Sequence, residues 1–377
     1  MRSQNKTDHD KRYMLAALEL AKRGLGNAWP NPSVGCILVK NFTKKNKSEV
    51  IGRGWTQPGG RPHAEIVALK QANYKTLNAI AFVTLEPCCH IGKTSPCIKE
   101  IIRSGISKVV VACRDPDPRV SGRGLLQLKN AGIEVVYGVC KKEAEKLNEG
   151  FFKKIKIGRP MVTVKVATTI DGCIATRSGD SKWITGDLSR QQGHLLRAKH
   201  DAVLVGVGTV IKDDPSLTCR LPGMKKFSPI RIIIDTALRT PLSSQLVRTS
   251  RSYPTWIFTN KIETSSRVKI FRKNGVHVIS LANQKTKNKV PLKTVMKKLA
   301  QEGITRVLVE GGSKVITSFM REQLVDHLVL FRSTKIIGSN GLTVAGNLKI
   351  ERLLNAISFN RTSIRESGED VVESYER

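Results

Sequence analysis

Within a 35-residue stretch of this sequence, five side chains are spaced so that they could bind a metal ion and transfer a proton. In chain order they are His63, Glu65, Cys88, Cys89 and Cys97. The three cysteines fit three kinds of site: a metal centre, a disulfide or a reactive thiol. The chain has 8 cysteines in 377 residues, without the dense spacing of small secreted domains, and cytosolic thiols stay reduced. A disulfide is therefore the least expected of the three.

The order and spacing of these residues favour a metal centre. A His-x-Glu motif followed by Pro-Cys and a second cysteine is the pattern of zinc-dependent nucleobase deaminases. Zinc held by one imidazole and two thiolates keeps its fourth position for water, whose pKa falls to about 7. His63, Cys88 and Cys97 would be the ligands, and Glu65 would transfer the water's proton. Cys89 is expected to pack as a small hydrophobic residue, because adjacent cysteines point apart.

The chain is strongly basic, with 64 Lys+Arg against 31 Asp+Glu and a net charge of +33. Nucleic acid is the obvious partner for such a charge. However, the basic residues are spread over the whole chain, and aromatic residues make up only 5%. No basic stripe alternates with the stacking side chains that single-strand binders use. We therefore expect a solvated basic surface that helps to attract a phosphorylated small molecule, and no nucleic-acid partner.

The N-terminal residues MRSQNKTDHDKRYM lack the apolar stretch of a secretion signal. No run approaches the roughly 18 apolar residues that a membrane-spanning helix needs. A soluble, cytoplasmic protein without a membrane partner is expected. A chain of 377 residues is too long for one ordinary core, so two domains are expected as well.

Strand and helix patterns alternate along the first 140 residues, which predicts a mostly parallel sheet covered by helices. After a helix over 11–24, strands are expected at 33–40, 79–86, 108–113 and 134–139, and helices at 62–72, 96–105 and 124–132. Residues 141–160 then resemble a polar helix that ends at Gly-Arg-Pro. We place the domain boundary there, with a first domain at 1–146, a linker at 147–159 and a second domain at 160–377.

The second domain contains a similar series. Strands are expected at 161–172, 202–209, 229–236, 256–260, 276–280 and 306–312, helices at 187–200, 292–303 and 314–324, and closing antiparallel strands from 327 onward. The dinucleotide-binding pattern Gly-x-Gly-x-x-Gly is absent, because Ile211 stands at the third glycine position. The sequence Glu-Gly-Gly-Ser at 310–313 lies between a strand and a helix, where backbone amides can approach a phosphate. A simple turn explains it equally well.

The first domain resembles the deaminase half of the bifunctional deaminase–reductases of riboflavin biosynthesis. That family has the same eight-residue interval between its cysteine ligands and a loop similar to His-x-Gly-Arg-Thr-Pro-Pro-Cys, where this chain has HIGKTSPC. Lys93 replaces the arginine, which keeps the charge but loses the two-pronged geometry. The segment PNPSVG also matches the family and implies that Asn31 binds the pyrimidine, although a turn between prolines explains this residue too. A further matching loop begins at Asp115, which could equally be a turn residue and receives no role.

Residues 160–220 and 310–312 resemble the reductase half of the same family, whose fold is similar to dihydrofolate reductase. The resemblance implies an NADPH site made of Ala167, Trp183, Thr209, Asp213, Gly312, Ser313, Lys314, Val315, Ile316, Thr317 and Ser318. It also implies substrate contacts from Ser181, Arg197, Leu217, Arg220 and Glu310. Two arginines suit a ribose phosphate, because guanidinium groups bind phosphate through paired hydrogen bonds. An ordinary ion pair would account for either arginine as well.

The resemblance implies an α/β protein with an N-terminal cytidine-deaminase-like three-layer α/β/α domain and a C-terminal dihydrofolate-reductase-like α/β domain. Its expected substrate is 2,5-diamino-6-(ribosylamino)-4(3H)-pyrimidinone 5′-phosphate. Hydrolytic deamination followed by NADPH-dependent reduction of the ribosyl chain would give 5-amino-6-(ribitylamino)uracil 5′-phosphate. The expected cofactors are NADPH and one zinc ion (Zn2+) per deaminase domain, and the chain is expected to form a homo-oligomer.

Two alternatives stay open on the sequence alone. An RNA adenosine or cytidine deaminase with an accessory domain would suit the basic charge, but the long Cys-x8-Cys interval and the scarcity of stacking aromatics do not favour it. A non-catalytic zinc protein that binds nucleic acid would need four protein ligands and no acid–base group. Glu65, two residues from the histidine, has no role in such a site.

Overall fold

A computed structural model describes residues 2–42, 47–90, 95–282 and 289–377. The chain divides into two compact units, Met1–Gly158 and Arg159–Arg377, and each is described by itself. Within the described ranges, no helix combines the length and the apolar character needed to cross a membrane. All eight cysteines lie in these ranges and none is paired in a disulfide.

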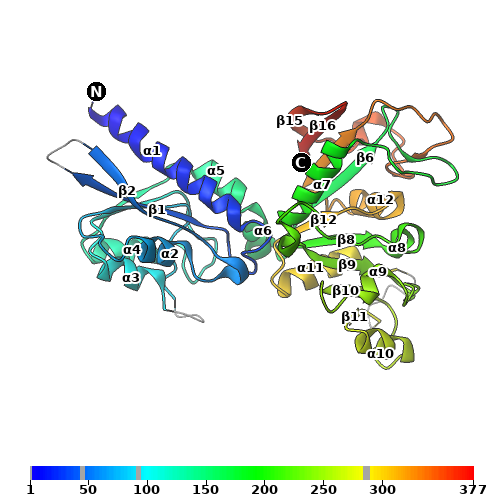
Figure 1. The fold of residues 1–377 in the computed structure, drawn as a ribbon, viewed down its shortest axis with the longest axis horizontal. Coiled ribbons are helices and arrows are strands. Elements are labelled where there is room, and N and C mark those ends of the chain that lie inside the picture. The colour runs from blue at the N-terminus through cyan, green and yellow to red at the C-terminus, as the bar shows by residue number, and fades with distance from the viewer. Residues whose placement is uncertain (1, 43–46, 91–94, 283–288) are drawn as a thin grey trace. The chain divides into compact units, whose positions relative to one another are not determined.

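The first unit is built on a five-stranded sheet with helices on both faces (Figure 1). The sheet order is β2-β1-β3-β4-β5. β1 pairs antiparallel with both β2 and β3, whereas β3, β4 and β5 run parallel. The sheet is therefore mixed rather than mostly parallel. The strands are β1 (Gly35–Phe42), β2 (Lys47–Trp55), β3 (Ile80–Val83), β4 (Lys108–Val111) and β5 (Glu134–Tyr137).

In the first unit, β2 is the described strand that the sequence pattern failed to predict, and its two glycines explain why. Glycine is uncommon in strand interiors, but here helix α2 (Ala64–Gln71) lies directly against the strand. A Cβ at Gly52 would lie 2.4 Å from the Ala68 carbonyl oxygen, and one at Gly54 only 2.0 Å from that of Ala64. The close packing of the helix that carries Glu65 thus requires residues that weaken the strand signal.

The helices form two layers around the sheet (Figure 1). One layer contains α1 (Arg2–Ala21) and α5 (Lys141–Leu147), and the other contains α2, α3 (Cys97–Arg103) and α4 (Arg123–Asn130). Apolar side chains between the layers, such as Met14, Phe82 and Leu128, have no exposed surface. Burial of each such side chain contributes roughly 1.5–3 kcal/mol. Short 3-10 helices at Lys22–Gly24 and Pro58–Gly60 complete the unit.

Residues 147–158, expected as a linker, belong to the first unit. Helix α5 stops at Asn148, and a second helix, α6 (Glu149–Ile157), follows at once. The side chain of Asn148 is buried, and hydrogen bonds satisfy its amide group. Its Oδ1 atom accepts the Ser33 N–H at 2.8 Å, and its Nδ2 atom donates to the Ser33 carbonyl oxygen at 2.9 Å. Phe151 is 8% exposed. The basic residues of α6 made this segment resemble a linker, but the helix also contributes the buried Phe151.

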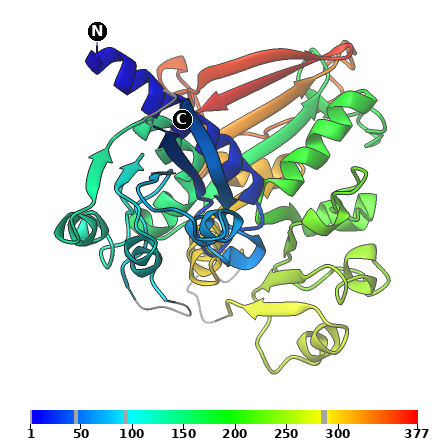
Figure 2. The same cartoon turned by 60° about the vertical axis from the view of Figure 1, so that its left-hand side comes forward.

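The second unit contains a nine-stranded sheet in the order β11-β10-β9-β8-β12-β6-β13-β16-β15 (Figures 1 and 2). The first seven strands in this order are parallel, and β16 and β15 add an antiparallel edge. The strands are β6 (Met161–Thr168), β8 (Ala202–Gly206), β9 (Ile230–Ile234), β10 (Thr255–Thr259), β11 (His277–Ser280), β12 (Arg306–Val309), β13 (His327–Arg332), β15 (Asn360–Ser367) and β16 (Asp370–Glu376).

Helices cover this sheet, and the remaining elements are short. The helices are α7 (Asp187–Ala198), α8 (Val207–Asp213), α9 (Gln245–Arg248), α10 (Ser266–Lys273), α11 (Leu292–Gln301) and α12 (Ser313–Arg321). A two-stranded pair joins β7 (Cys173–Ala175) to β14 (Leu342–Thr343), and 3-10 turns lie at Lys225–Phe227 and Leu353–Asn355.

Two expectations for the second unit need correction. The strand expected at 202–209 ends at Gly206, because Val207 begins helix α8. The strand from residue 327 was expected to be antiparallel, but β13 lies parallel to β6 and pairs antiparallel only with β16. Its valine- and leucine-rich pattern fits either direction, since strand direction depends on the neighbouring strands rather than on local composition.

Candidate active sites

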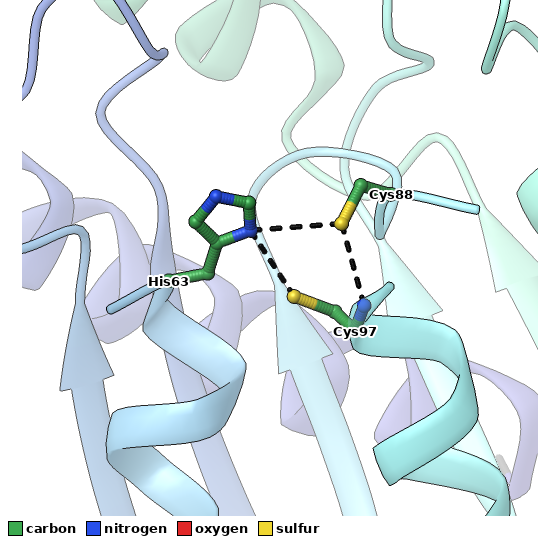
Figure 3. A group of neighbouring side chains, drawn as sticks. All are labelled: His63, Cys88 and Cys97. Carbon is green, nitrogen blue, oxygen red and sulfur yellow. Dashed lines mark hydrogen bonds between the residues drawn. The ribbon is translucent and has the colours of Figure 1, made fainter. Parts of the chain in front are cut away.

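His63, Cys88 and Cys97 meet in the first unit, although they come from three separate segments (Figure 3). His63 caps the start of α2, Cys88 lies in the loop after β3, and Cys97 is the first residue of α3. The His63 Nδ1 atom lies 3.2 Å from the Cys97 Sγ atom and 3.6 Å from the Cys88 Sγ atom. The possible ligand atoms of all three residues lie within 4.8 Å of one another.

This geometry fits a tetrahedral metal ion. Zinc–ligand bonds of about 2.0–2.3 Å place neighbouring ligand atoms roughly 3.5–3.8 Å apart, close to the spacing between His63 and the two sulfurs. Two helix N-termini contribute to the arrangement, and positive helix ends favour thiolates. The backbone N–H of Cys97 also donates to the Cys88 sulfur at 3.3 Å. Among the described residues, this is the only such cluster of histidine, cysteine and acidic side chains.

The hydrogen bond between the two thiols shifts their pKa values in opposite directions. A hydrogen bond from the Cys97 thiol, helped by the neighbouring His63, lowers the pKa of Cys88 to about 4. The same bond raises the pKa of Cys97 well above its usual range. Cys89 is different: its Sγ atom donates to the Arg119 carbonyl oxygen at 3.6 Å, and the residue packs against the hydrophobic core. The expected division between two metal-ligand candidates and one packing cysteine therefore agrees with the geometry.

Glu65 lies in the first turn of α2 and is only 4% exposed. Burial raises the pKa of its carboxyl group, although the nearby His63 partly opposes this effect. The carboxyl group also contacts the Cys97 side chain. Glu65 is thus a buried acid beside the three possible metal ligands, which is the arrangement that proton transfer requires.

A cavity of about 250 Å³ opens beside these residues, and His63, Glu65, Cys88 and Asn31 line it. The Asn31 Nδ2 atom donates to the Gly60 carbonyl oxygen at 2.8 Å and lies 3.3 Å from the His63 Nε2 atom. The amide nitrogen is therefore engaged by protein atoms, and the amide oxygen is the part of Asn31 suited to a ligand. Lys93, the changed residue of the family loop, lies outside the described residues.

The cavity has walls that the sequence analysis did not assign. One wall comes from the loop after β4 and includes Asp115, Asp117 and Arg119. Burial raises the pKa of Asp115 to about 7. The other wall comes from α6 and includes Phe151 and Lys154, with Lys154 Nζ donating to the Pro30 carbonyl oxygen at 2.8 Å. The family-like loop at Asp115 was a usable signal for the first wall, whereas nothing in the local pattern indicated the second.

In the second unit, Arg197 and Glu310 form a two-pronged ion pair. Both Arg197 Nε–Glu310 Oε1 and Arg197 Nη2–Glu310 Oε2 distances are 2.7 Å, and the side chains are 15% and 11% exposed. Burial raises the pKa of Glu310, but the arginine outweighs it and lowers the value to about 2. Arg197 Nη1 donates to the Thr218 carbonyl oxygen at 3.0 Å. The paired face of this guanidinium is thus turned to Glu310 rather than left for a phosphate.

The other expected substrate residues are placed in different ways. Arg220 is exposed, and its Nη1 atom donates to the Ser216 hydroxyl at 2.8 Å. Leu217 is 3% exposed and packs in the core, so any substrate contact would come from its backbone. Ser181 is half-buried in the segment before α7. Lys165, for which the sequence predicted no role, lies beside Glu310, and burial lowers the pKa of the lysine.

The expected cofactor residues gather where parallel strands end. β8 and β12 are neighbours, and their carboxyl ends lead into α8, which carries Thr209, and α12, which begins after Gly312. A Cβ at Gly312 would meet Thr209 Oγ1 at 3.8 Å and nothing closer. The two segments therefore border the same open space. In open α/β sheets, ligands bind at this carboxyl edge.

Not every residue from Gly312 to Ser318 can face a ligand. The backbone amides of Val315 and Ile316 already donate to the Gly312 carbonyl oxygen, and Ile316 is 1% exposed. The Thr317 hydroxyl donates to the Ser313 carbonyl oxygen at 2.6 Å. An α-helix leaves its first amides without internal acceptors, so the start of α12 is its binding part.

The other three residues that were expected to bind the cofactor lie on different parts of the second unit. Trp183 is 59% exposed, with the Arg190 guanidinium 4.5 Å from its ring centre. Asp213 ends α8, and Ala167 lies in β6.

Two family models match the chain. The model described as "RibD C-terminal domain" matches residues 160–372. The model described as "Cytidine and deoxycytidylate deaminase zinc-binding region" matches residues 7–113. Each match lies within one of the two compact units. The fold expected from the sequence, a deaminase-like domain followed by a reductase-like domain, is confirmed.

Curated relatives and solved structures match over almost the whole chain. The riboflavin biosynthesis protein RibD of Aquifex aeolicus is 44% identical over 368 residues, which cover 98% of each chain. That of Escherichia coli K12 is 37% identical and covers 96% of this chain and 98% of its own.

A RibD structure from Acinetobacter baumannii has a TM-score of 0.87 at 34% identity, with 98% of this chain and 99% of that chain covered. A deaminase/reductase structure from Thermotoga maritima has a TM-score of 0.84 at 36% identity, with the same coverage. The chain therefore belongs to the RibD family of bifunctional deaminase–reductases of riboflavin biosynthesis.

Proposed function

We propose that the first unit hydrolytically deaminates 2,5-diamino-6-(ribosylamino)-4(3H)-pyrimidinone 5′-phosphate and that the second reduces the ribosyl chain with NADPH. The T. maritima relative is named diaminohydroxyphosphoribosylaminopyrimidine deaminase/5-amino-6-(5-phosphoribosylamino)uracil reductase. The observation that carries the proposal is the cluster of His63, Cys88 and Cys97, in which His63 and Cys88 line one cavity together with the buried Glu65. The product would be 5-amino-6-(ribitylamino)uracil 5′-phosphate.

The chemistry of the donor set supports zinc as the metal. One imidazole nitrogen and two thiolates at tetrahedral spacing suit zinc and leave a fourth position open. When bound, zinc supplies an acidified water at that position. His63, Cys88 and Cys97 would hold the ion, and Cys89 would take no part.

The chain's own residues then control the proton and the orientation of the ring. Glu65 is the one carboxyl group in the first turn of α2, next to the ligands, and it would accept the water's proton and deliver it to the ring and the departing ammonia. The Asn31 amide oxygen, which accepts no hydrogen bond from the residues that the structure describes, would accept one from the ring. Low exposure of Glu65 keeps bulk water from competing for the proton.

For the reductase, the start of α12 supports a phosphate of NADPH. Gly312 lets the backbone approach the ligand closely, and the first amides of the helix point outward. Hydride transfer is the chemistry of the cofactor. The chain would hold the substrate from the side of Arg220, whose exposed guanidinium can reach a phosphate. The Arg197–Glu310 pair would form a rigid polar wall at the same carboxyl edge of the sheet.

The variant Gly312→Val tests this cofactor site. A side chain at Gly312 has room in the fold, because its Cβ would meet nothing closer than 3.8 Å, but it would occupy the space of the bound phosphate. We expect the Kd for NADPH to rise at least about 10-fold, a loss of about 1.4 kcal/mol. Fluorescence titration measures it, and ammonia release by the same preparation should be unchanged. An NADPH affinity equal to that of the wild type would show that the cofactor lies elsewhere.

A further inference from the structure

Glu86 is a buried acidic residue that the proposed chemistry does not use. It follows strand β3 and precedes Cys88 by two residues, and it is 3% exposed. Its carboxylate accepts four backbone N–H groups. The Oε1 atom accepts those of Gly124 at 2.9 Å and Leu125 at 3.2 Å, and the Oε2 atom accepts those of Gly122 at 3.0 Å and Asp115 at 3.3 Å.

Three of these donors belong to the beginning of helix α4. Helices leave their first amides without internal acceptors, and a side chain at the cap position often satisfies them. The cap residue here is Gly122, which has no side chain, so Glu86 takes over the function from a distant segment. Its negative charge also suits the positive end of the helix.

The start of α4 lies very close to the segment that carries Glu86 and Pro87. A Cβ at Gly124 would lie 2.7 Å from the Pro87 carbonyl oxygen and 3.0 Å from Glu86 Oε1. Only glycine therefore allows the start of α4 to approach the turn that carries Cys88. The segments around Cys88 and Gly124 are consequently held at a fixed separation by Glu86.

The fourth donor extends this link to the cavity wall. Asp115, whose amide Glu86 binds, begins the loop that lines the cavity together with Asp117 and Arg119. Further along, the Asp115 Oδ1 atom accepts the Asp117 amide at 2.8 Å, and Asp117 binds the Arg119 guanidinium. A movement of the Glu86 carboxylate would therefore shift this wall, whereas His63 and Cys97 lie at the starts of other helices.

We propose that Glu86 is a positioning residue for the deamination: its carboxylate fixes the distance between the Cys88 turn and the 115–119 wall, and so determines how well the pyrimidine substrate fits. The inference rests on the proposed deaminase function. It predicts that disturbing Glu86 weakens substrate binding more than it slows the chemical step, because Glu65, His63 and Cys97 lie on other segments.

The variant Glu86→Gln tests this inference. The amide has the same shape, but its NH2 group would face two backbone N–H donors and lose their hydrogen bonds. We expect the KM for the diaminopyrimidine phosphate to rise at least 10-fold, with kcat within threefold of the wild type. Metal content and NADPH oxidation on the already deaminated substrate should not change. Glu143→Gln, an exposed residue in the first turn of α5, is the matched control and should behave as the wild type.

A second variant and the wild type distinguish failure of this inference from failure of the proposed function. Gly124→Ala disturbs the same contact from α4 and should also raise KM, and it carries the test if Glu86→Gln does not fold. If the wild type fails to deaminate the substrate, the proposed function is wrong. If the wild type deaminates it and both variants keep a wild-type KM, or lose kcat only in proportion to lost folded protein, Glu86 is a helix cap alone and the inference is overturned.

Discussion

The variant Glu65→Gln should lose nearly all ammonia release while it keeps its metal. Glutamine has the shape of glutamate but cannot accept a proton, and general acid–base groups contribute typically about 10²–10⁴-fold to a rate. The residue sits in the first turn of a helix that packs tightly on β2, so the exchange should not disturb the fold. Steady-state ammonia release measures the loss, and elemental analysis measures the metal.

The reductase provides the internal control for this variant. Reduction of the already deaminated substrate should proceed at the wild-type rate, because the expected reductase residues lie in the other compact unit. Glu19→Gln, an exposed change on α1, should leave both activities intact. Normal deamination by Glu65→Gln would refute the proposed proton-transfer role.

Serine substitutions of the three clustered cysteines should divide them into two classes. Cys88→Ser and Cys97→Ser should each lose the metal and ammonia release, since each removes one of the three proposed protein ligands. Loss of an outer partner of a metal ligand already costs about 10–100-fold in affinity, so loss of a ligand should cost at least about 100-fold. Cys89→Ser should retain both metal and activity, because its thiol contacts the Arg119 carbonyl oxygen and the core instead.

Metal titration with a competing chelator measures the three affinities under one set of conditions. Cys89→Ser serves as the matched control, because it makes the same chemical change one residue away. Metal loss in Cys89→Ser together with retention in Cys88→Ser would reverse the assignment of the ligands.

The possible metal ligands could be predicted because their signals are local. His63 and Cys97 both begin helices, and those helix starts are visible in the sequence. The side chains of adjacent residues point apart, which favours only one of Cys88 and Cys89 as a ligand without any knowledge of the fold. The spacing of the sequence predicts Cys88 rather than Cys89 as a ligand, and the structure brings together the three residues that were expected to meet.

The walls of the cavity could not be predicted in the same way. Phe151 and Lys154 come from a helix more than 80 residues after His63. The lysines of this helix and the Gly-Arg-Pro sequence after it made the segment resemble a linker. The side of α6 that lines the cavity can be identified only from the fold, in which Asn148 binds Ser33 just before the helix begins. Strand β2 could not be predicted for a similar reason. Its glycines are required by contact with α2, which lies further along the chain and does not belong to the local sequence pattern of the strand.

Arg197 shows the limit for charged residues. A guanidinium suits a phosphate or a carboxylate equally well, and the sequence alone does not reveal which one it meets. Glu310 lies 113 residues further along the chain, at the end of a neighbouring part of the sheet. The resemblance to the reductase half implied that both belong to one site, and the fold shows that they bind each other.

The most direct test of the central claim follows both products in a single sample. The purified chain is given 2,5-diamino-6-(ribosylamino)-4(3H)-pyrimidinone 5′-phosphate, first without and then with NADPH. We predict ammonia release before NADPH is added, followed by oxidation of NADPH equimolar with the ammonia released. Absence of ammonia release by the metal-loaded protein, with salt-sensitive binding of RNA instead, would contradict the account.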